Sequence, residues 1–543
     1  MKQCIFVLLL LIQYSQFILY AQTPVLVKNI HPTGGSDPEE LTDLGGVLFF
    51  RANDLAHGYE LWRSDGTTEG TQMVMNIHPD GHSNPNHLTP AGSFLFFTAT
   101  DGSHGIELWY IDDRFDATPI MYDINPNGSS NPEYLTKMAG EVYFSANDGV
   151  HGIELWKTDG TFTGTQLVKD INPEGNSWPE ELIYYNGAVY FSAESDNHNR
   201  ELWKSDGTPE GTNMVLDINQ AGSSNPGQFE ISDNMLFFHA KDLPVNGTEL
   251  WKTDGTAEGT HLVKNISPNG NGDPRELTDF NGVLYFQATQ GPSDVELWKS
   301  DGTSEGTVMV KDIHPTSSSN PKLFTPYRNH LLFSATDGIT GYELWKTDGS
   351  EIGTELVKDI NPQGNANSSP NELLVYHDKI YFQCSDGPHG KELWSTDGTA
   401  EMTSMIADIN PIGSGDPSQL AISNDILFFQ ANDGVTGHEL WKLDFSTRIE
   451  SSHMSEIAHK LFPNPASNSF FIEINALNAI DLELRMFDLT GKMCVHKHIG
   501  QIHEKVTIEI HTEDLPAGMY LVQLVNQSGK IGWFEKLVKQ SPF

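Results

Sequence analysis

The chain has 543 residues, with 73 Asp and Glu against 32 Lys and Arg, and a formal net charge of −41. This length exceeds one ordinary hydrophobic core, so several domains or an array of repeats is expected. The negative charge repels nucleic acid and anionic lipid, which argues against both as partners, and favours cations and solubility. With only three cysteines, a disulfide framework is excluded as well.

Residues 1–21 have the pattern of a secretory signal peptide. Lys2 precedes a mostly apolar run, Cys4–Leu19, and the small residue Ala21 stands at the expected cleavage site. A transmembrane anchor is the alternative, but the run is short and polar residues interrupt it between 13 and 16. We expect Sec export to the periplasm and no transmembrane anchor.

The tripeptide Glu-Leu-Trp occurs nine times in the chain. Its tryptophans lie 47 to 49 residues apart: Trp62, Trp109, Trp156, Trp203, Trp251, Trp298, Trp345, Trp394 and Trp441. A period this regular indicates a solenoid, a propeller or an array of small domains.

Each period predicts four strands. Residues 181–219 hold an apolar run, the hairpin signal Asn186-Gly187, a β-branched and aromatic segment, the segment around Trp203, an Asp-Gly turn and a last apolar segment. No stretch has helical periodicity. Four strands in about 45 residues are typical of a propeller blade, whereas a β-helix has shorter rungs and immunoglobulin-like domains are about twice as long.

The two ends of the repeat region predict a closed ring. Residues 25–32 match the fourth strand of a repeat, and the last repeat stops after 439–445 without a fourth strand. An N-terminal strand that completes the last blade would remove an exposed sheet edge. We therefore predict an all-β chain with a nine-bladed propeller over residues 22–446. Because propellers usually have four to eight blades, a smaller ring with additional blades, or two rings, is the alternative.

Within Glu-Leu-Trp, alternate side chains face opposite sides of the strand. We expect the tryptophan to fill the space between neighbouring blades. The glutamate beside it then needs partners, and we expect backbone N–H groups of an adjacent turn or Ser/Thr hydroxyls. A packing role that is repeated in each of the nine blades explains the motif better than nine ligand-binding glutamates.

The motif D-G-T-x-x-G-T predicts the turn between the third and fourth strands. Glycine allows positive φ, and aspartate bonds back to the backbone. The logic is similar to that of the Asp-box turn of sialidase propellers, which is structural and does not imply glycosidase activity. The aspartates concerned are Asp65, Asp159, Asp206, Asp254, Asp301, Asp348 and Asp397.

Two loop types share the opposite face of the predicted ring, exemplified by residues 146–152 and 170–179. Both are rich in Asp, Asn, Ser and Gly, which form turns and also offer oxygen ligands. Calcium is the cofactor that these loops would suit, although no D-x-D-x-D-G loop is present. Histidines recur five residues before the tryptophan, and we interpret them as surface-loop residues rather than metal ligands: His57, His104, His151, His198 and His389.

A specific site is expected where the repeat changes, or around the central channel. The deviations are Tyr110–Ile120, Glu194–Arg200, Lys241–Gly247 and Thr289–Asp294. The chain contains no H-E-x-x-H, no G-x-S-x-G, no phosphate-binding loop and no Cys/His cluster. No catalytic residue can therefore be named.

After a polar linker, 447–458, residues 459–543 alternate predicted strands with Gly and Pro turns, which predicts a small immunoglobulin-like β-sandwich. This segment is nearly neutral, with 8 Lys and Arg against 9 Asp and Glu. Its motifs resemble the type A C-terminal sorting domain of the type IX (Por) secretion system of Bacteroidetes. They include Pro463, Asn464, Pro465, Gly491, Gly518, Tyr520 and Lys539. The resemblance implies a type IX machinery partner and export across the outer membrane, often with removal of this domain, and then surface attachment or release.

The propeller region resembles the bacterial ELWxxDGT-repeat proteins over residues 23–446, although repeats two and nine depart from the D-G-T segment. That family has no settled activity to carry over. The leading hypothesis is a secreted or cell-surface protein that binds glycan, protein or cations at an acidic, loop-rich face. The alternatives are a hydrolase or lyase acting on polysaccharide or peptide at the propeller axis, and a structural surface component. Near-identical blades favour binding or structure over catalysis, because an enzyme usually needs one asymmetric cluster of groups.

Overall fold

The computed structural model describes residues 23–112, 118–195, 199–242, 246–291, 294–445, 457–462, 468–476, 480–488, 493–502, 505–513, 515–526 and 531–540. These residues form strands and turns and contain no helix. Contacts divide the chain into two compact units, 1–445 and 446–543. Within the described ranges, no helix is long and apolar enough to cross a membrane.

The first unit consists of nine four-stranded antiparallel sheets, which confirms the predicted number of blades. Blade 1 holds β2 (Glu39–Leu44), β3 (Val47–Asn53), β4 (Tyr59–Ser64) and β5 (Gln72–Met75). Blade 2 holds β6 (Asn86–Ala91), β7 (Phe94–Thr100), β8 (Ile106–Asp112) and β9 (Ile120–Tyr122). Blade 3 holds β10 (Glu133–Met138), β11 (Glu141–Asn147), β12 (Ile153–Thr158) and β13 (Gln166–Lys169). Blade 4 holds β14 (Glu180–Tyr185), β15 (Ala188–Glu194), β16 (Arg200–Ser205) and β17 (Asn213–Leu216). Blade 5 holds β18 (Gly227–Ser232), β19 (Met235–Asp242), β20 (Gly247–Thr253) and β21 (His261–Lys264). Blade 6 holds β22 (Arg275–Phe280), β23 (Val283–Thr289), β24 (Val295–Ser300) and β25 (Val308–Lys311). Blade 7 holds β26 (Lys322–Tyr327), β27 (His330–Thr336), β28 (Tyr342–Thr347) and β29 (Glu355–Lys358). Blade 8 holds β30 (Asn371–Tyr376), β31 (Lys379–Ser385), β32 (Lys391–Thr396) and β33 (Ser404–Ala407).

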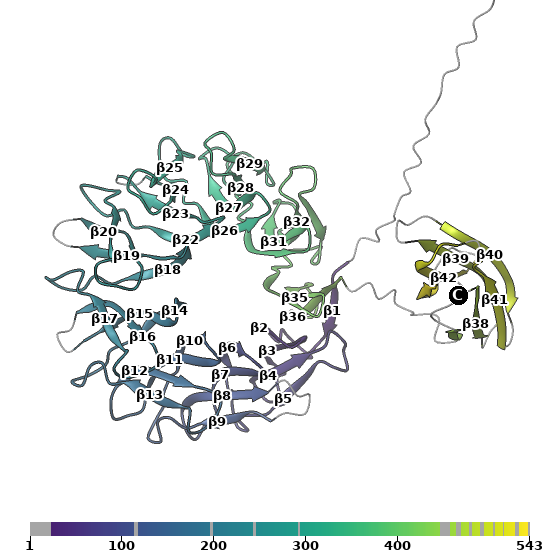
Figure 1. Ribbon diagram of the computed structural model, residues 1–543, viewed down its shortest axis with the longest axis horizontal. Coiled ribbons are helices and arrows are strands. Elements are labelled where there is room, and N and C mark those ends of the chain that lie inside the picture. The colour runs from purple at the N-terminus through teal and green to yellow at the C-terminus, as the bar shows by residue number, and fades with distance from the viewer. Residues whose placement is uncertain are drawn as a thin grey trace, which may run out of the picture. The chain divides into compact units, whose positions relative to one another are not determined.

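Blade 9 is built from both ends of the unit. It contains β34 (Ser418–Ser423), β35 (Ile426–Asn432) and β36 (His438–Asp444), and its fourth strand is β1 (Val25–Lys28). Leu26 pairs with Trp441 in this sheet, as predicted for ring closure. Each innermost strand contacts the innermost strand of the next blade, and β34 contacts β2. Figure 1 shows the resulting ring, with β2, β6, β10, β14, β18, β22 and β26 toward its centre.

The hydrophobic core of the ring lies between the blades. The leucine of each Glu-Leu-Trp is fully buried and belongs to the same hydrophobic cluster as the tryptophan of the next blade, beginning with Leu61 and Trp109. All nine interfaces follow this rule, and Leu440 with Trp62 makes the closing one. Burial of a large aromatic side chain at every interface stabilises a ring whose sheets are individually small.

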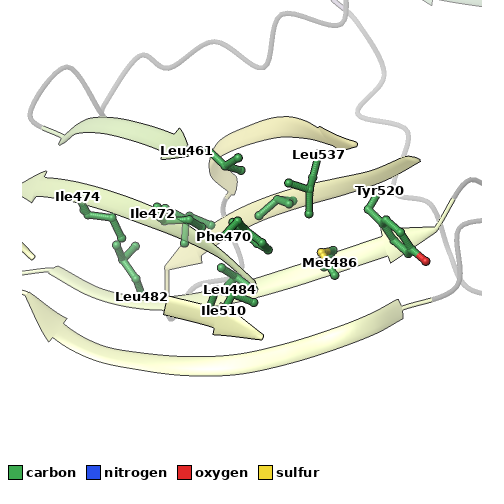
Figure 2. Close-up of a cluster of buried hydrophobic side chains, with 12 residues drawn as sticks. Leu461, Phe470, Ile472, Ile474, Leu482, Leu484, Met486, Ile510, Tyr520 and Leu537 are labelled. Carbon is green, nitrogen blue, oxygen red and sulfur yellow. The ribbon is translucent and has the colours of Figure 1, made fainter. Parts of the chain in front are cut away.

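The second unit is a β-sandwich. A three-stranded sheet holds β37 (Ile457–Phe462), β38 (Ser469–Ala476) and β41 (Lys505–His511). A four-stranded sheet holds β40 (Met493–Ile502), β39 (Ile480–Asp488), β42 (Gly518–Asn526) and β43 (Ile531–Lys539). Side chains from both sheets, including Phe470, Ile472, Leu484 and Leu537, form one buried core (Figure 2).

Candidate binding face

The buried glutamates of the repeat fix the loops of one face, which we call the loop face. It is formed by the loops between the second and third strands of a blade and those that lead from one blade to the next. Glu60 is fully buried and accepts hydrogen bonds from Ile77 N at 2.9 Å, Ser83 N at 3.2 Å and Ser83 Oγ at 2.6 Å. These are the kinds of partner that the sequence predicted.

The other eight glutamates bind the next connecting loop in the same way: Glu107, Glu154, Glu201, Glu249, Glu296, Glu343, Glu392 and Glu439. Burial raises the pKa of all nine carboxyls, to about 7 for Glu154, Glu249 and Glu343, while the hydrogen bonds oppose the rise. Because these buried carboxylates already accept hydrogen bonds from the connecting loops, the nine glutamates anchor loops.

The predicted turn aspartates lie on the face opposite the loop face. Asp65 Oδ1 accepts hydrogen bonds from Thr67 N at 2.8 Å and Thr67 Oγ1 at 2.7 Å, and Thr67 Oγ1 accepts one from Gly70 N at 2.9 Å. A Cβ on Gly70 would lie 2.0 Å from Asp65 Oδ1, so glycine is required there. The other six aspartates accept the equivalent pair of bonds from a Thr or Ser: Asp159, Asp206, Asp254, Asp301, Asp348 and Asp397.

The loop histidines belong to short local turns. The Nδ1 atoms of His57, His104, His151 and His389 lie 2.7 Å from the carboxylate of the aspartate three residues earlier. This contact raises the pKa of His104, His151 and His389. His198 lies outside the described residues. Among the residues that the structure describes, no three His, Cys, Asp or Glu are grouped to hold a metal ion, and calcium stays a prediction.

All four repeat deviations lie partly outside the described residues, which omit 113–117, 196–198, 243–245 and 292–293. The described part of the repeat-two deviation is an aromatic packing feature. The ring of Tyr110 stacks on Tyr122 with centroids 5.3 Å apart and meets Phe94 edge-on at 5.5 Å. Tyr122 Oη donates to the Gly160 carbonyl of the next blade. Nothing in this cluster points to a ligand.

Three of the predicted sorting-domain residues can be placed. Gly518 begins β42, Tyr520 Oη donates to the Pro516 carbonyl at 2.8 Å, and the buried Lys539 donates from Nζ to the Leu515 carbonyl. Both side chains therefore hold the loop before β42. Pro463, Asn464, Pro465 and Gly491 lie outside the described residues.

Sequence reasoning did not single out three positions per blade that differ between blades and lie close to the constant Glu-Leu-Trp. We call them the variable ring. They lie at the loop-face ends of the first three strands, where antiparallel pairing places the first residue of strand one opposite the fifth of strand two, as in Glu39 and Arg51. The first positions are Glu39, Asn86, Glu133, Glu180, Gly227, Arg275, Lys322, Asn371 and Ser418. The second are Arg51, Thr98, Ser145, Ser192, His239, Gln287, Ser334, Gln383 and Gln430. The third, which precede the buried glutamates, are Tyr59, Ile106, Ile153, Arg200, Thr248, Val295, Tyr342, Lys391 and His438.

Charge is unevenly distributed around the variable ring. Acids occupy its first position in blades 1, 3 and 4, and Arg51 and Arg200 accompany those of blades 1 and 4. In blades 6, 7 and 8, Arg275, Lys322 and Lys391 bring positive charge without an acid of the variable ring. The loop face is therefore not uniformly acidic, although the unit carries most of the negative charge. The variation is also visible in the sequence when the nine repeats are aligned column by column.

Residues 460–540 match the family model of the secretion system C-terminal sorting domain. The predicted sorting domain is thereby confirmed, and it supports export through the type IX secretion system and interaction with its machinery. A comparison with curated proteins finds no match for this chain.

Among solved structures, PorZ is described as an essential bacterial surface component of the type IX secretion system of Porphyromonas gingivalis. It is 12% identical, with 92% of this chain and 75% of that chain covered and a TM-score of 0.36. The β-propeller domain of the Trilobed protease from Pyrococcus furiosus is 10% identical, with 67% and 95% covered and a TM-score of 0.34. A puromycin-hydrolyzing peptidase of Mycobacterium tuberculosis is 12% identical, with 64% and 57% covered and a TM-score of 0.36. At TM-scores this low, the matches carry no conclusion about the activity or partners of this chain.

Proposed function

We propose that the chain is a secreted or cell-surface binding protein that recognises an extracellular glycan or protein through the loop face of its propeller. The observation that carries the proposal is the variable ring. The Glu, Leu and Trp of the repeat are the same in all nine blades, while the side chains at the loop-face ends of three strands differ from blade to blade. Variation of this kind on a rigid scaffold is typical of recognition surfaces.

The anchoring of the loops supports the proposal. Ser83, in the loop from blade 1 to blade 2, donates to Glu60 and to the Tyr59 carbonyl of blade 1, and its own carbonyl accepts from Thr100 N of blade 2. A connecting loop fastened to both blades loses little conformational entropy when a ligand binds. The sorting domain would bring this surface to the cell exterior.

No described feature favours the hydrolase or lyase alternative. Three carboxylates of the innermost strands have backbone partners: Glu40 accepts from Leu88 N, Glu181 from Gln228 N, and Glu276 from Leu323 N. These bonds tie adjacent blades together.

The test is a glycan and extracellular-matrix protein array probed with the full secreted chain, once with calcium and once with chelator. We expect saturable binding to at least one glycan or protein, weakened by substitutions in the variable ring. Loss of binding in chelator would support calcium in the loops. Absence of both binding and hydrolytic activity would leave the structural alternative.

A further inference from the structure

A hollow of about 260 Å³ opens at the loop face between blades 7 and 8. The hollow is lined by the three variable-ring residues of blade 7, Lys322, Ser334 and Tyr342, and by those of blade 8, Asn371, Gln383 and Lys391. None of its lining residues is an Asp or Glu, although the chain has more than twice as many acids as bases. A hollow with two lysines and no carboxylate is therefore unusual for this protein.

The two lysines differ from Arg51 and Arg200 of the variable ring in having no carboxylate partner. Arg51 pairs with Glu39, and Arg200 pairs with Glu180 at 3.2 Å and Glu194 at 3.3 Å. Within the part of the chain that the structure describes, neither Lys322 nor Lys391 forms an ion pair, and both side chains are exposed. Lys322 Nζ lies 5.8 Å from the centroid of the Tyr342 ring.

Ser334 gives a second and independent indication of a ligand. It is fully buried, and its Oγ has no hydrogen-bond partner in the described structure. At the same position in other blades, Gln383 Nε2 donates to the Pro417 carbonyl at 2.9 Å and His239 Nδ1 lies 3.2 Å from the Pro274 carbonyl. The serine makes no such bond to the corresponding Pro370, which lines the same hollow. An unpaired buried hydroxyl is costly, and a bound ligand would satisfy it.

We propose that this hollow binds an oxyanion substituent, a carboxylate or a sulfate, carried on a glycan. Lys322 and Lys391 would bind the oxyanion, and Ser334 and Asn371 would bind sugar hydroxyls. The inference rests on the proposed binding function and names its ligand class.

The charges favour a glycan over an acidic peptide or another dense polyanion. The net charge of −41 repels any closely spaced row of negative groups, so a favoured ligand separates its charges by neutral units. Glycans that alternate an acidic with a neutral sugar have this property. The neutral hydrogen-bonding groups beside the lysines also suit hydroxyls better than a peptide backbone, which is usually bound by adding a strand to a sheet edge.

The experiment measures calorimetric binding of the full chain to four probes: a hyaluronan oligosaccharide, its carboxyl-reduced form, a keratan sulfate oligosaccharide and an aspartate-rich peptide. We expect binding to the first or third probe, which identifies carboxylate or sulfate as the source. No binding to the carboxyl-reduced form is expected. Binding of the peptide alone, or equal binding of the reduced and acidic hyaluronan, would overturn the proposal.

Three variants locate the site. Lys322→Gln and Lys391→Gln should each weaken binding roughly tenfold, the usual effect of losing a charge-assisted hydrogen bond. Ser334→Gln should abolish binding without changing charge, because the longer glutamine side chain would occupy the hollow. A melting curve checks that this variant folds. Lys137→Gln, which removes another exposed lysine, is the matched control. Unchanged affinity in Ser334→Gln would overturn the assignment.

The glycan and protein array distinguishes failure of this inference from failure of the proposed function. If the chain binds a neutral glycan or a protein but no acidic glycan, this inference fails and the proposed function stands. If the chain binds nothing, both fail.

Discussion

Ser36 Oγ donates a hydrogen bond of 2.6 Å to Glu439 Oε2, and 403 residues separate the two along the chain. The same carboxylate accepts from Ile30 N at 3.0 Å and His31 N at 3.1 Å. One buried glutamate thus holds the N-terminal segment in place after β1 has completed blade 9. In the other blades the equivalent loop continues directly from the fourth strand of the same blade. Here the bonds to Glu439 help to close the ring, together with the pairing of β1 and β36 and the packing of Leu440 and Trp62.

Ser36→Ala should loosen the closed ring. Loss of a bond to a buried carboxylate costs about 1–3 kcal/mol, and here it loosens the segment that leads from β1 to β2. We expect faster proteolysis and faster amide exchange in residues 23–36. Ser177→Ala removes the equivalent bond to Glu154 and is the control, because the loop of Ser177 joins blades 3 and 4 and does not take part in ring closure. Equal protection of residues 23–36 in both variants would contradict this account of closure.

Gly70→Ala should destabilise blade 1 by steric conflict. The added Cβ would lie 2.0 Å from Asp65 Oδ1, and Gly70 does not have positive φ. We expect a loss of roughly 2–3 kcal/mol, measured by chemical denaturation, as for other overpacked sites. Gly92→Ala, at φ +65° with no atom near its Cβ, should lose only about 1 kcal/mol through backbone strain. Asp65→Ala combined with Gly70→Ala should be little worse than Asp65→Ala alone.

Stability should fall as pH rises from about 5 to 8. The folded chain holds protons on buried glutamates whose pKa is raised from the ordinary 4.5 to about 7 for Glu154, Glu249 and Glu343. The unfolded chain releases those protons near pH 4.5, so this contribution is full below that pH and is lost toward pH 7. The lowered pKa values of turn aspartates such as Asp159 and Asp206 act oppositely and remove stability as pH falls below about 4.

Urea unfolding midpoints between pH 3 and 8 measure this dependence, and we expect their maximum on the acid side of neutrality. Glu154→Gln cannot titrate at that position, so its midpoint should vary less steeply between pH 5 and 8. A midpoint that rises steadily through this range would show that ionisation of the buried glutamates does not destabilise the folded chain.

Deletion of residues 459–543 should leave the propeller folded but stop its export across the outer membrane. The propeller has its own closed core, and the sorting domain has a separate one. Cell fractionation of the native host should find the truncated chain in the periplasm and the full chain outside. The milder Lys539→Ala removes the bond to the Leu515 carbonyl and should reduce export in part. Normal export of the deletion variant would show that the domain does not direct it.

Much of the fold could be predicted because the repeat recurs in the sequence at a nearly constant spacing. Nine copies of one hydrophobic and turn pattern indicate nine blades, and the offset between the first and last strands indicates the closing pair β1 and β36. The partners of Glu60 could be predicted by type, because a buried carboxylate needs donors and the neighbouring turn supplies them. The predicted signal peptide lies outside the described residues, and only residues 457 and 458 of the predicted linker are described, so both stay predictions.

The candidate binding site could not be predicted in this way. No local sequence pattern marks the site, because Lys322, Ser334 and Lys391 lie apart in the chain. Two tertiary relationships bring the three residues to the same hollow. Antiparallel register places Lys322 opposite Ser334, and the packing of blade 8 on blade 7 brings Lys391 to the same hollow. The sequence by itself determined the blades, since local periodicity and turn chemistry act within about 47 residues. Only the tertiary structure decided which variable side chains meet at the loop face, because contacts between blades depend on register and ring geometry.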